Sequence, residues 1–226
     1  MYGVGSFKGK VKLADLVREY KLPMNAVAVI LKTGELKYPS YSWYNNYTDP
    51  KADSTIECNI NAMMRHFTAH RMGFCVDQDS KMPHIFHLAC RAVLLTTTYY
   101  LNNTKSIQYD KTLARPNNYN TDNSLGLYIP AEVIYSLNKS QAKLEDNSKD
   151  QLEVIIYDLL FKLSIKTPNF NGFNDTAANF VDTLLLAVFK YVRLYIEDSE
   201  LITDFKKTID GNFDKSIAAY LHSFLG

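Results

Sequence analysis

The amino-acid sequence predicts an all-α protein, a bundle of about seven or eight helices. Apolar residues recur at three- and four-residue spacing along the chain, which is the period of one helix face. Capping residues stand at the borders of these stretches, and the alternation typical of strands is missing. The 226 residues, 46% of them hydrophobic, are enough to bury a sizeable core.

Each expected helix has a sequence signal at one or both ends. Gly34 and Gly73 are placed to end helices, Pro83 to open one, and Ser148 with Gln151 to form a capping box. A break is expected at Asp210–Gly211. Leu184, Leu185 and Val188 are expected to be buried. The expected helices cover residues 10–20, 23–34, 54–72, 83–101, 130–137, 148–167, 174–196 and 213–225.

The chain divides into three parts in this reading. Residues 1–104 form a helical module, residues 105–124 an Asn-rich loop, and residues 125–226 a C-terminal helical region that can belong to the same bundle. The formal net charge of +1 argues against non-specific nucleic-acid binding, which depends on many cationic contacts to phosphates. No apolar run is long enough to cross a membrane. Three widely spaced cysteines predict free thiols in a reducing compartment, hence the cytoplasm.

Ionisable residues gather between Arg65 and Arg91, a window that holds four of the five histidines. His84 and His87 are three residues apart and share one helix face, which Arg91 continues. The other members are His66, near the end of the preceding helix, and two loop carboxylates, Asp77 and Asp79. Imidazoles and carboxylates together suit a divalent metal, although such residues are also common as plain polar surface.

A second feature follows Gly34, where Lys37 and Tyr38 precede the only tryptophan, Trp43. A lysine beside aromatic rings can hold a phosphate while the rings hold a base. The alternative is a tyrosine-rich loop packed on the bundle.

Together these motifs resemble the N-terminal type of dATP/dGTP diphosphohydrolase, over about residues 24–101. That family carries Gly-x-x-Lys-Tyr with a nearby Trp, then Arg-His, Gly-Glu, Asp-x-Glu-Ser and Pro-His-x-x-His. The corresponding segments here are Gly34–Tyr38 with Trp43, Arg65–His66, Gly73–Phe74, Asp77–Ser80 and Pro83–His87. The family is linked to the all-α NTP pyrophosphohydrolases of the MazG type, whose acidic helix motifs are not evident in this region.

The resemblance implies a metal-dependent hydrolase of purine deoxynucleoside triphosphates that releases pyrophosphate and the monophosphate. It implies Mg²⁺ or Mn²⁺ as the metal, a homodimer or higher homo-oligomer, and the cytoplasm, that of the host if the gene belongs to a phage. The implied roles are metal binding by Asp77, Asp79, His84 and His87, catalysis by His66 and Asp77, and substrate binding by Lys37, Tyr38, Trp43, Arg65 and Arg91.

Three positions depart from the family pattern. Phe74 and Asp79 each replace a glutamate, and Lys81 stands where glycine is common. The loss of a carboxylate at Phe74 leaves a second function open, a non-catalytic nucleotide-binding or protein-interaction protein that keeps the fold. A third alternative is a structural bundle whose polar cluster only stabilises a helical hairpin.

Overall fold

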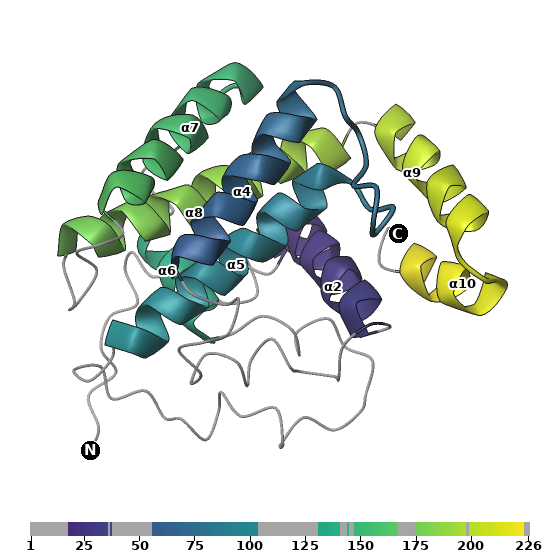
Figure 1. Ribbon diagram of the computed structural model, residues 1–226, viewed down its shortest axis with the longest axis horizontal. Coiled ribbons are helices and arrows are strands. Elements are labelled where there is room, and N and C mark those ends of the chain that lie inside the picture. The colour runs from purple at the N-terminus through teal and green to yellow at the C-terminus, as the bar shows by residue number, and fades with distance from the viewer. Residues whose placement is uncertain are drawn as a thin grey trace, which may run out of the picture.

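A computed structural model of the chain describes residues 18–35, 37, 56–103, 131–140, 144, 147–166, 175–197 and 199–223. Every regular element in these ranges is a helix, which confirms the all-α prediction; the only β pairing there is an isolated bridge between Val76 and Pro83. Figure 1 shows the described helices, which are α2 (Lys21–Glu35), α4 (Ile56–Arg71), α5 (His84–Asn103), α6 (Ala131–Ser140), α7 (Lys149–Lys166), α8 (Asp175–Ile196), α9 (Ser199–Asn212) and α10 (Lys215–Ser223).

The hairpin of α4 and α5 lies across the middle of the bundle (Figure 1). α8 passes behind it and packs against α2, α5, α6 and α7. α7 lies beside α4 on one side, α2 packs against α5 on the other, and α9 and α10 form a smaller hairpin at one edge. The loop of the central hairpin, residues 72–83, carries most of the candidate site.

One continuous core joins the helices on both sides of the Asn-rich segment, which itself lies outside the described residues. Leu184, Leu185 and Val188 of α8 are fully buried within the chain, as predicted. α5 is buried almost all round, because α2, α4 and α8 cover it from several sides.

The predicted helix ends agree with the structure where capping residues are strong. Gly73 ends α4 with a positive φ of 85°, and Phe74 N donates to Ala69 O in the turn that follows. Ser148 and Gln151 form the expected capping box, in which Ser148 N donates to Oε1 of Gln151 over 2.9 Å and Gln151 N to Oγ of Ser148 over 3.3 Å.

The C-terminal prediction was wrong in one place. The break expected at Asp210–Gly211 does not occur, because α9 continues to Asn212. The actual break is at Phe213–Asp214, where the Asp214 carboxylate accepts a hydrogen bond from Ser216 N and caps α10. α9 itself was not among the expected helices. A glycine in the last turn of a helix is tolerated at small cost, so Gly211 alone was a weak signal.

A buried carboxylate fixes the packing of α6 against α5 and α8. Oδ1 of Asp182 on α8 accepts hydrogen bonds from Tyr100 and Ser136, both over 2.7 Å. Lys139 Nζ lies 3.1 Å from the other carboxylate oxygen. Asp182 is fully buried, so these partners offset the cost of removing its charge from water.

The three cysteines form no disulfide; Cys58 and Cys75 are exposed and Cys90 is buried. Among the described residues, no helix combines the length and apolar character that a bilayer crossing requires.

Candidate metal centre

The loop between α4 and α5 folds into a short hairpin of its own. Asp77 N donates to Met82 O over 2.9 Å, and His84 N donates to Cys75 O over 3.2 Å, on either side of the Val76–Pro83 bridge. This pairing places Asp77 beside the first turn of α5. The loop carboxylate therefore lies next to histidines that come from both helices.

Three potential metal ligands meet at this point. His66 projects from the last part of α4, His84 is the first residue of α5, and Asp77 comes from the loop. Nδ1 of His66 lies 2.9 Å from Nδ1 of His84, and one ligand atom from each of the three residues lies within 4.8 Å of the others. Both histidines are buried and Asp77 is half-buried.

His87 and Ser80 contact the residues of this cluster. The His87 ring stacks on the His66 ring, with 4.5 Å between the centroids and 8° between the planes. Nε2 of His87 lies 2.7 Å from Oγ of Ser80, and this hydroxyl also donates to Oδ1 of Asp77 over 3.0 Å. Ser80 thus connects His87 to Asp77 and orients both side chains.

The surroundings keep the imidazoles neutral. Burial, followed by the nearby charges of His87 and Arg65, lowers the pKa of His66 to about 3. Burial also lowers the pKa of His87 to about 4, against the opposing effect of Asp77. The pKa of His84 is lowered by burial as well, with Asp77 opposing and Arg65 adding to the shift. Near neutral pH these imidazoles are already neutral, so they do not have to release a proton before they bind a metal ion.

Asp77 remains ionised for a different reason. Burial acts to raise its pKa, but the backbone and side-chain hydrogen bonds from Ser80 and the charges of His87 and His66 together leave the pKa below its usual value. Ser80 N donates over 3.0 Å and Asp79 N over 3.2 Å to Oδ1. The centre therefore offers two neutral nitrogens and one carboxylate charge.

This donor set fits a divalent metal ion. Two ligand atoms at about 2.1 Å from one ion, in neighbouring octahedral positions, are separated by about 3.0 Å. The 2.9 Å between the two Nδ1 atoms is close to that edge. Imidazole with carboxylate suits first-row ions such as Mn²⁺ better than a purely oxygen-loving ion such as Mg²⁺.

The remaining predicted residues lie at different distances from this centre. The Asp79 side chain is exposed and outside the three-residue cluster. Arg65 is exposed beside His66, and its charge acts on the histidines. Arg91 lies one turn after His87 and donates to Oδ1 of Asn59 over 3.3 Å. Lys37 is exposed in the turn after α2. Tyr38 and Trp43 lie outside the described residues.

Two contributions to the site were not among the predicted residues. Ser80 was part of the quoted motif but had no role, and the signal that could have found it is the Asp-x-x-Ser spacing of an Asx turn. Lys81 follows with a φ of 59°, in the left-handed region that favours glycine. This conformation explains why glycine suits the position and why Lys81 is strained there.

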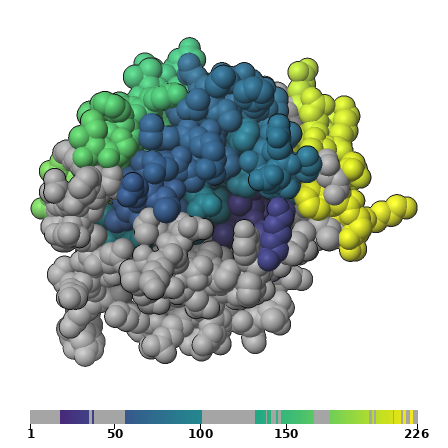
Figure 2. Space-filling model, viewed as in Figure 1, coloured from purple at the N-terminus to yellow at the C-terminus, as the bar shows by residue number. Residues whose placement is uncertain are grey.

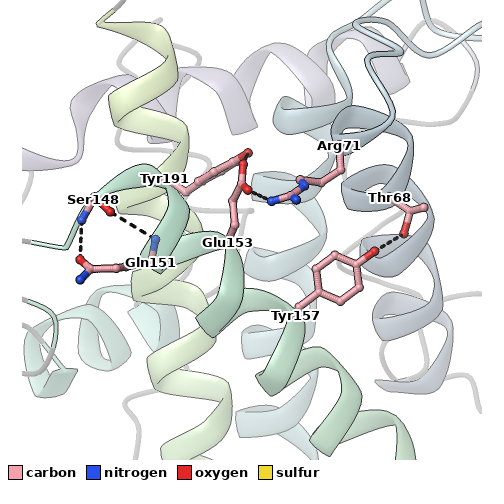
Figure 3. A network of polar contacts seen from close by, with 7 residues as sticks. All are labelled: Thr68, Arg71, Ser148, Gln151, Glu153, Tyr157 and Tyr191. Atoms are coloured by element: carbon pink, nitrogen blue, oxygen red, sulfur yellow. Dashed lines mark hydrogen bonds and ion pairs between the residues drawn. The ribbon is translucent and has the colours of Figure 1, made fainter.

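The second missed contribution comes from the C-terminal helices, as Figure 3 shows. Glu153 of α7 accepts a hydrogen bond from the Tyr191 hydroxyl of α8 over 2.7 Å and forms an ion pair with Arg71 at the end of α4. The Tyr157 hydroxyl lies 3.1 Å from Oγ1 of Thr68 (Figure 3). Since Thr68 and Arg71 flank the end of α4 just beyond His66, α7 and α8 hold the segment that presents this ligand.

His70, one turn after His66, lies in the same junction. Its ring contacts Tyr195 edge-on with 4.7 Å between centroids, and Lys149 Nζ lies 4.3 Å from the Tyr195 centroid. Burial, then the charges of His84, Arg71 and Lys149, lowers its pKa to about 4. The junction thus places positive charge close to the candidate centre.

The candidate centre lies inside a segment with known relatives. Residues 5–108 match the family described as dATP/dGTP diphosphohydrolase, N-terminal. No curated protein and no solved structure is significantly similar to the chain. The matched segment contains His66, Asp77, Ser80, His84 and His87, whereas α6 to α10 lie beyond it. The similarity to the dATP/dGTP diphosphohydrolase N-terminal family thus covers slightly less than half of the chain, residues 5–108.

Proposed function

We propose that the chain is a metal-dependent hydrolase of purine deoxynucleoside triphosphates. The observation that carries the proposal is the cluster of His66, Asp77 and His84, which lies within the segment matched by a dATP/dGTP diphosphohydrolase family. We infer a divalent ion at these three residues, Mn²⁺ in preference to Mg²⁺, because two of the three donors are nitrogens. Such an ion would neutralise phosphate charge and lower the pKa of a bound water.

The reaction proposed is hydrolysis between the α- and β-phosphates. The oxygen of water bonds to the α-phosphorus, the bond from that phosphorus to the bridging oxygen breaks, pyrophosphate leaves with the electron pair, and the proton lost by the water passes to the solvent. Of the two roles expected for His66, ligand and base, the 2.9 Å Nδ1 separation from His84 favours the ligand role. Asp77 provides the negative charge of the centre.

Cationic side chains around the centre would bind the triphosphate. Arg65 is exposed next to His66, and its electrostatic effect on all three clustered histidines supports a position within reach of a phosphate. Arg91 and Lys37 are assigned to the same task. Tyr38 and Trp43 are proposed for the base, and the cytoplasm as the location.

A non-catalytic nucleotide-binding protein is the second candidate. Phe74 favours it, because an exposed apolar ring stands where the family carries a glutamate, and Asp77 is the one carboxylate in the cluster. The two candidates share the binding site and differ only in turnover.

The experiment measures Mn²⁺ binding and nucleotide binding by titration calorimetry, and pyrophosphate release from dATP, dGTP, dCTP and dTTP with Mn²⁺ or Mg²⁺. The hydrolase proposal expects release from the purine nucleotides and loss of about a hundredfold or more in rate for Asp77→Asn. His222→Ala, which removes the one histidine outside the window, is the matched control and should keep full activity. Binding of Mn²⁺ and nucleotide without any release would select the non-catalytic candidate, and binding of neither would overturn both.

A further inference from the structure

α7 is apolar on two faces, and only one of them is covered. One face packs against α4 and α8 through buried leucine and isoleucine side chains. The other face exposes large apolar side chains to solvent, with exposed fractions between 42% and 69%. These exposed residues are Val154, Tyr157, Phe161 and Ile165. A helix that is hydrophobic all round is normally buried on all sides, so a covering element for this face is missing from the described chain.

The exposed residues form one stripe along the helix. At about 100° per residue, Val154, Phe161 and Ile165 fall within about 40° of one another, and Tyr157 lies on one flank. Asp158 lies about 40° from Val154 on the side opposite Tyr157, and Lys162 lies about 80° from Val154 on that same flank. Figure 2 shows α7 at the margin of the face in view, beside α4.

The spacing of this stripe is the same in both directions. The central positions are 154, 158, 161 and 165, so the intervals are four, three and four residues. Two such helices in antiparallel orientation place Val154 of one level with Ile165 of the other at both ends. The midpoint lies between residues 159 and 160, and a two-fold axis there relates the two helices without any offset.

We propose that α7 pairs in antiparallel orientation with α7 of a second copy of this chain. The charges on the stripe support a second copy over an unrelated partner. Asp158 and Lys162 are half-exposed and form an ion pair within one helix, with 2.5 Å between Nζ and Oδ2. In an antiparallel two-fold pair each flank meets the same flank of the other helix, and Asp158 then lies within about 1.5 Å along the axis of Lys162 of the second copy. Two symmetric ion pairs therefore join the copies.

The size of the stripe sets the expected affinity. A standard stable interface covers about 800 Å² on each partner. A stripe only three turns long, with four apolar side chains, covers less than this. The dimer should therefore dissociate in the micromolar range, corresponding to about 8 kcal/mol of binding free energy. This pairing is independent of the proposed hydrolysis, since none of its residues belongs to the candidate metal centre.

The test measures the mass of the full chain by sedimentation velocity between about 0.05 and about 100 µM, a range that brackets a dissociation constant near 1 µM. The wild type should change from monomer to dimer across this range. Phe161→Glu should remain a monomer throughout. The matched control is Met72→Glu, because Met72 is as exposed as Val154, at 69%, but lies on the hairpin loop outside α7. This control should dimerise as the wild type does, and far-UV circular dichroism should show unchanged helix content for each variant.

Charge reversal distinguishes a second copy from any other partner. Asp158→Lys and Lys162→Asp should each weaken self-association at least about tenfold, since each places like charges across the axis, equivalent to about 1.4 kcal/mol. An equimolar mixture of the two single variants should dimerise again, although neither helix regains its internal ion pair. A wild type that stays monomeric at every concentration overturns the proposal. So does a dimer that persists in Phe161→Glu. A mixture that does not re-associate overturns the antiparallel pairing and points instead to another protein or another segment of this chain.

Discussion

Nδ1 of His66 and Nδ1 of His84 lie 2.9 Å apart, a separation at which one ring donates and the other accepts. Two protonated rings cannot occupy this arrangement, because both nitrogens would then carry a hydrogen. The pair therefore has one proton between its facing nitrogens, or a metal ion in place of that proton. This competition between a proton and a metal ion underlies the first two predictions.

Substitution of a proposed metal ligand should weaken Mn²⁺ binding more than substitution of a residue that only positions a ligand. His84→Ala removes a proposed ligand and should weaken Mn²⁺ binding by about a hundredfold or more, whereas Ser80→Ala, which acts through Asp77 and His87, should weaken it by about tenfold. Titration calorimetry at pH 7.5 gives both values. Equal effects of the two variants would contradict the assignment of His84 as a ligand and Ser80 as a positioning residue.

Acidification should destabilise the protein before its carboxylates are protonated. The folded-state pKa of His66 is about 3, and that of His70 and His87 about 4, all below the value of about 6.5 for an unfolded histidine. Between these values the unfolded state binds more protons. The stabilising contribution is therefore complete above about pH 6.5 and is lost as the pH falls toward 4 and then 3.

His70→Phe tests this in urea unfolding at pH 7.5, 6.0 and 5.0. The variant keeps a ring against Tyr195 and removes one titrating group, so the slope of unfolding free energy against pH should decrease by about 1.4 kcal/mol per pH unit for one proton. An unchanged slope would mean that His70 titrates alike in both states.

The two left-handed residues of the hairpin predict opposite responses to substitution. Lys81 has a φ of 59° and Gly73 a φ of 85°. Lys81→Gly should stabilise the protein by about 0.5–1 kcal/mol, because it removes backbone strain that exceeds the added entropy of glycine. Gly73→Ala should destabilise it by about 1–2 kcal/mol, and from conformation alone, since a Cβ at Gly73 meets no atom within 4 Å. Thermal unfolding of each variant measures its change in stability relative to the wild type.

The Glu153 junction should affect metal binding as well as stability. Glu153→Ala leaves the fully buried Tyr191 hydroxyl without its acceptor and should cost about 2–3 kcal/mol of unfolding free energy. Because the junction holds the end of α4, Mn²⁺ affinity should also decrease by about tenfold at temperatures where the variant is fully folded. Asp204→Asn, in an exposed pair with Lys207, is the control and should change neither quantity. Full metal affinity in folded Glu153→Ala would show that the junction is only structural.

Phe74→Glu should increase activity if the family's glutamate takes part in the centre. Phe74 is 57% exposed at the start of the loop, so the substitution leaves no core cavity and should change stability by less than about 0.5 kcal/mol. We expect higher Mn²⁺ affinity and faster pyrophosphate release than in the wild type. Phe74→Gln, which has the same length without the charge, should leave both at the wild-type level.

Local signals were sufficient for much of the fold. The capping box at Ser148, the glycine at position 73 and the apolar line of Leu184 and Val188 each depend on neighbours close in sequence. α9 was missed because its apolar positions are held by a distant helix, as in the contact of Phe205 with Phe86, whose ring centroids are 4.8 Å apart. A helix with few apolar positions can therefore be recognised only when the helix that covers them is known.

In the candidate site, too, the features that depend on nearby residues could be predicted and those that depend on distant helices could not. The sequence indicated that His66, Asp77, His84 and His87 lie around one loop, because they flank a predicted helical hairpin. Which histidines face each other depends on the rotation of α4 against α5, and these helices also pack on α7 and α8, which are distant in sequence. His84 meets His66 through facing Nδ1 atoms, whereas the His87 ring stacks on His66 and its Nε2 contacts Ser80, and this difference was therefore not available from spacing.

α5 is buried on nearly all sides, and the helices that cover it lie partly inside and partly outside the segment that the family model matches. The matched segment ends at residue 108, yet Tyr100 within it donates to Asp182 of α8 and contacts the Tyr135 ring of α6, and both helices lie beyond the segment. The position of α5 thus depends on packing against α8, which the matched segment does not contain. Substitutions in α8, outside the matched segment, should therefore affect the candidate metal centre at the start of α5.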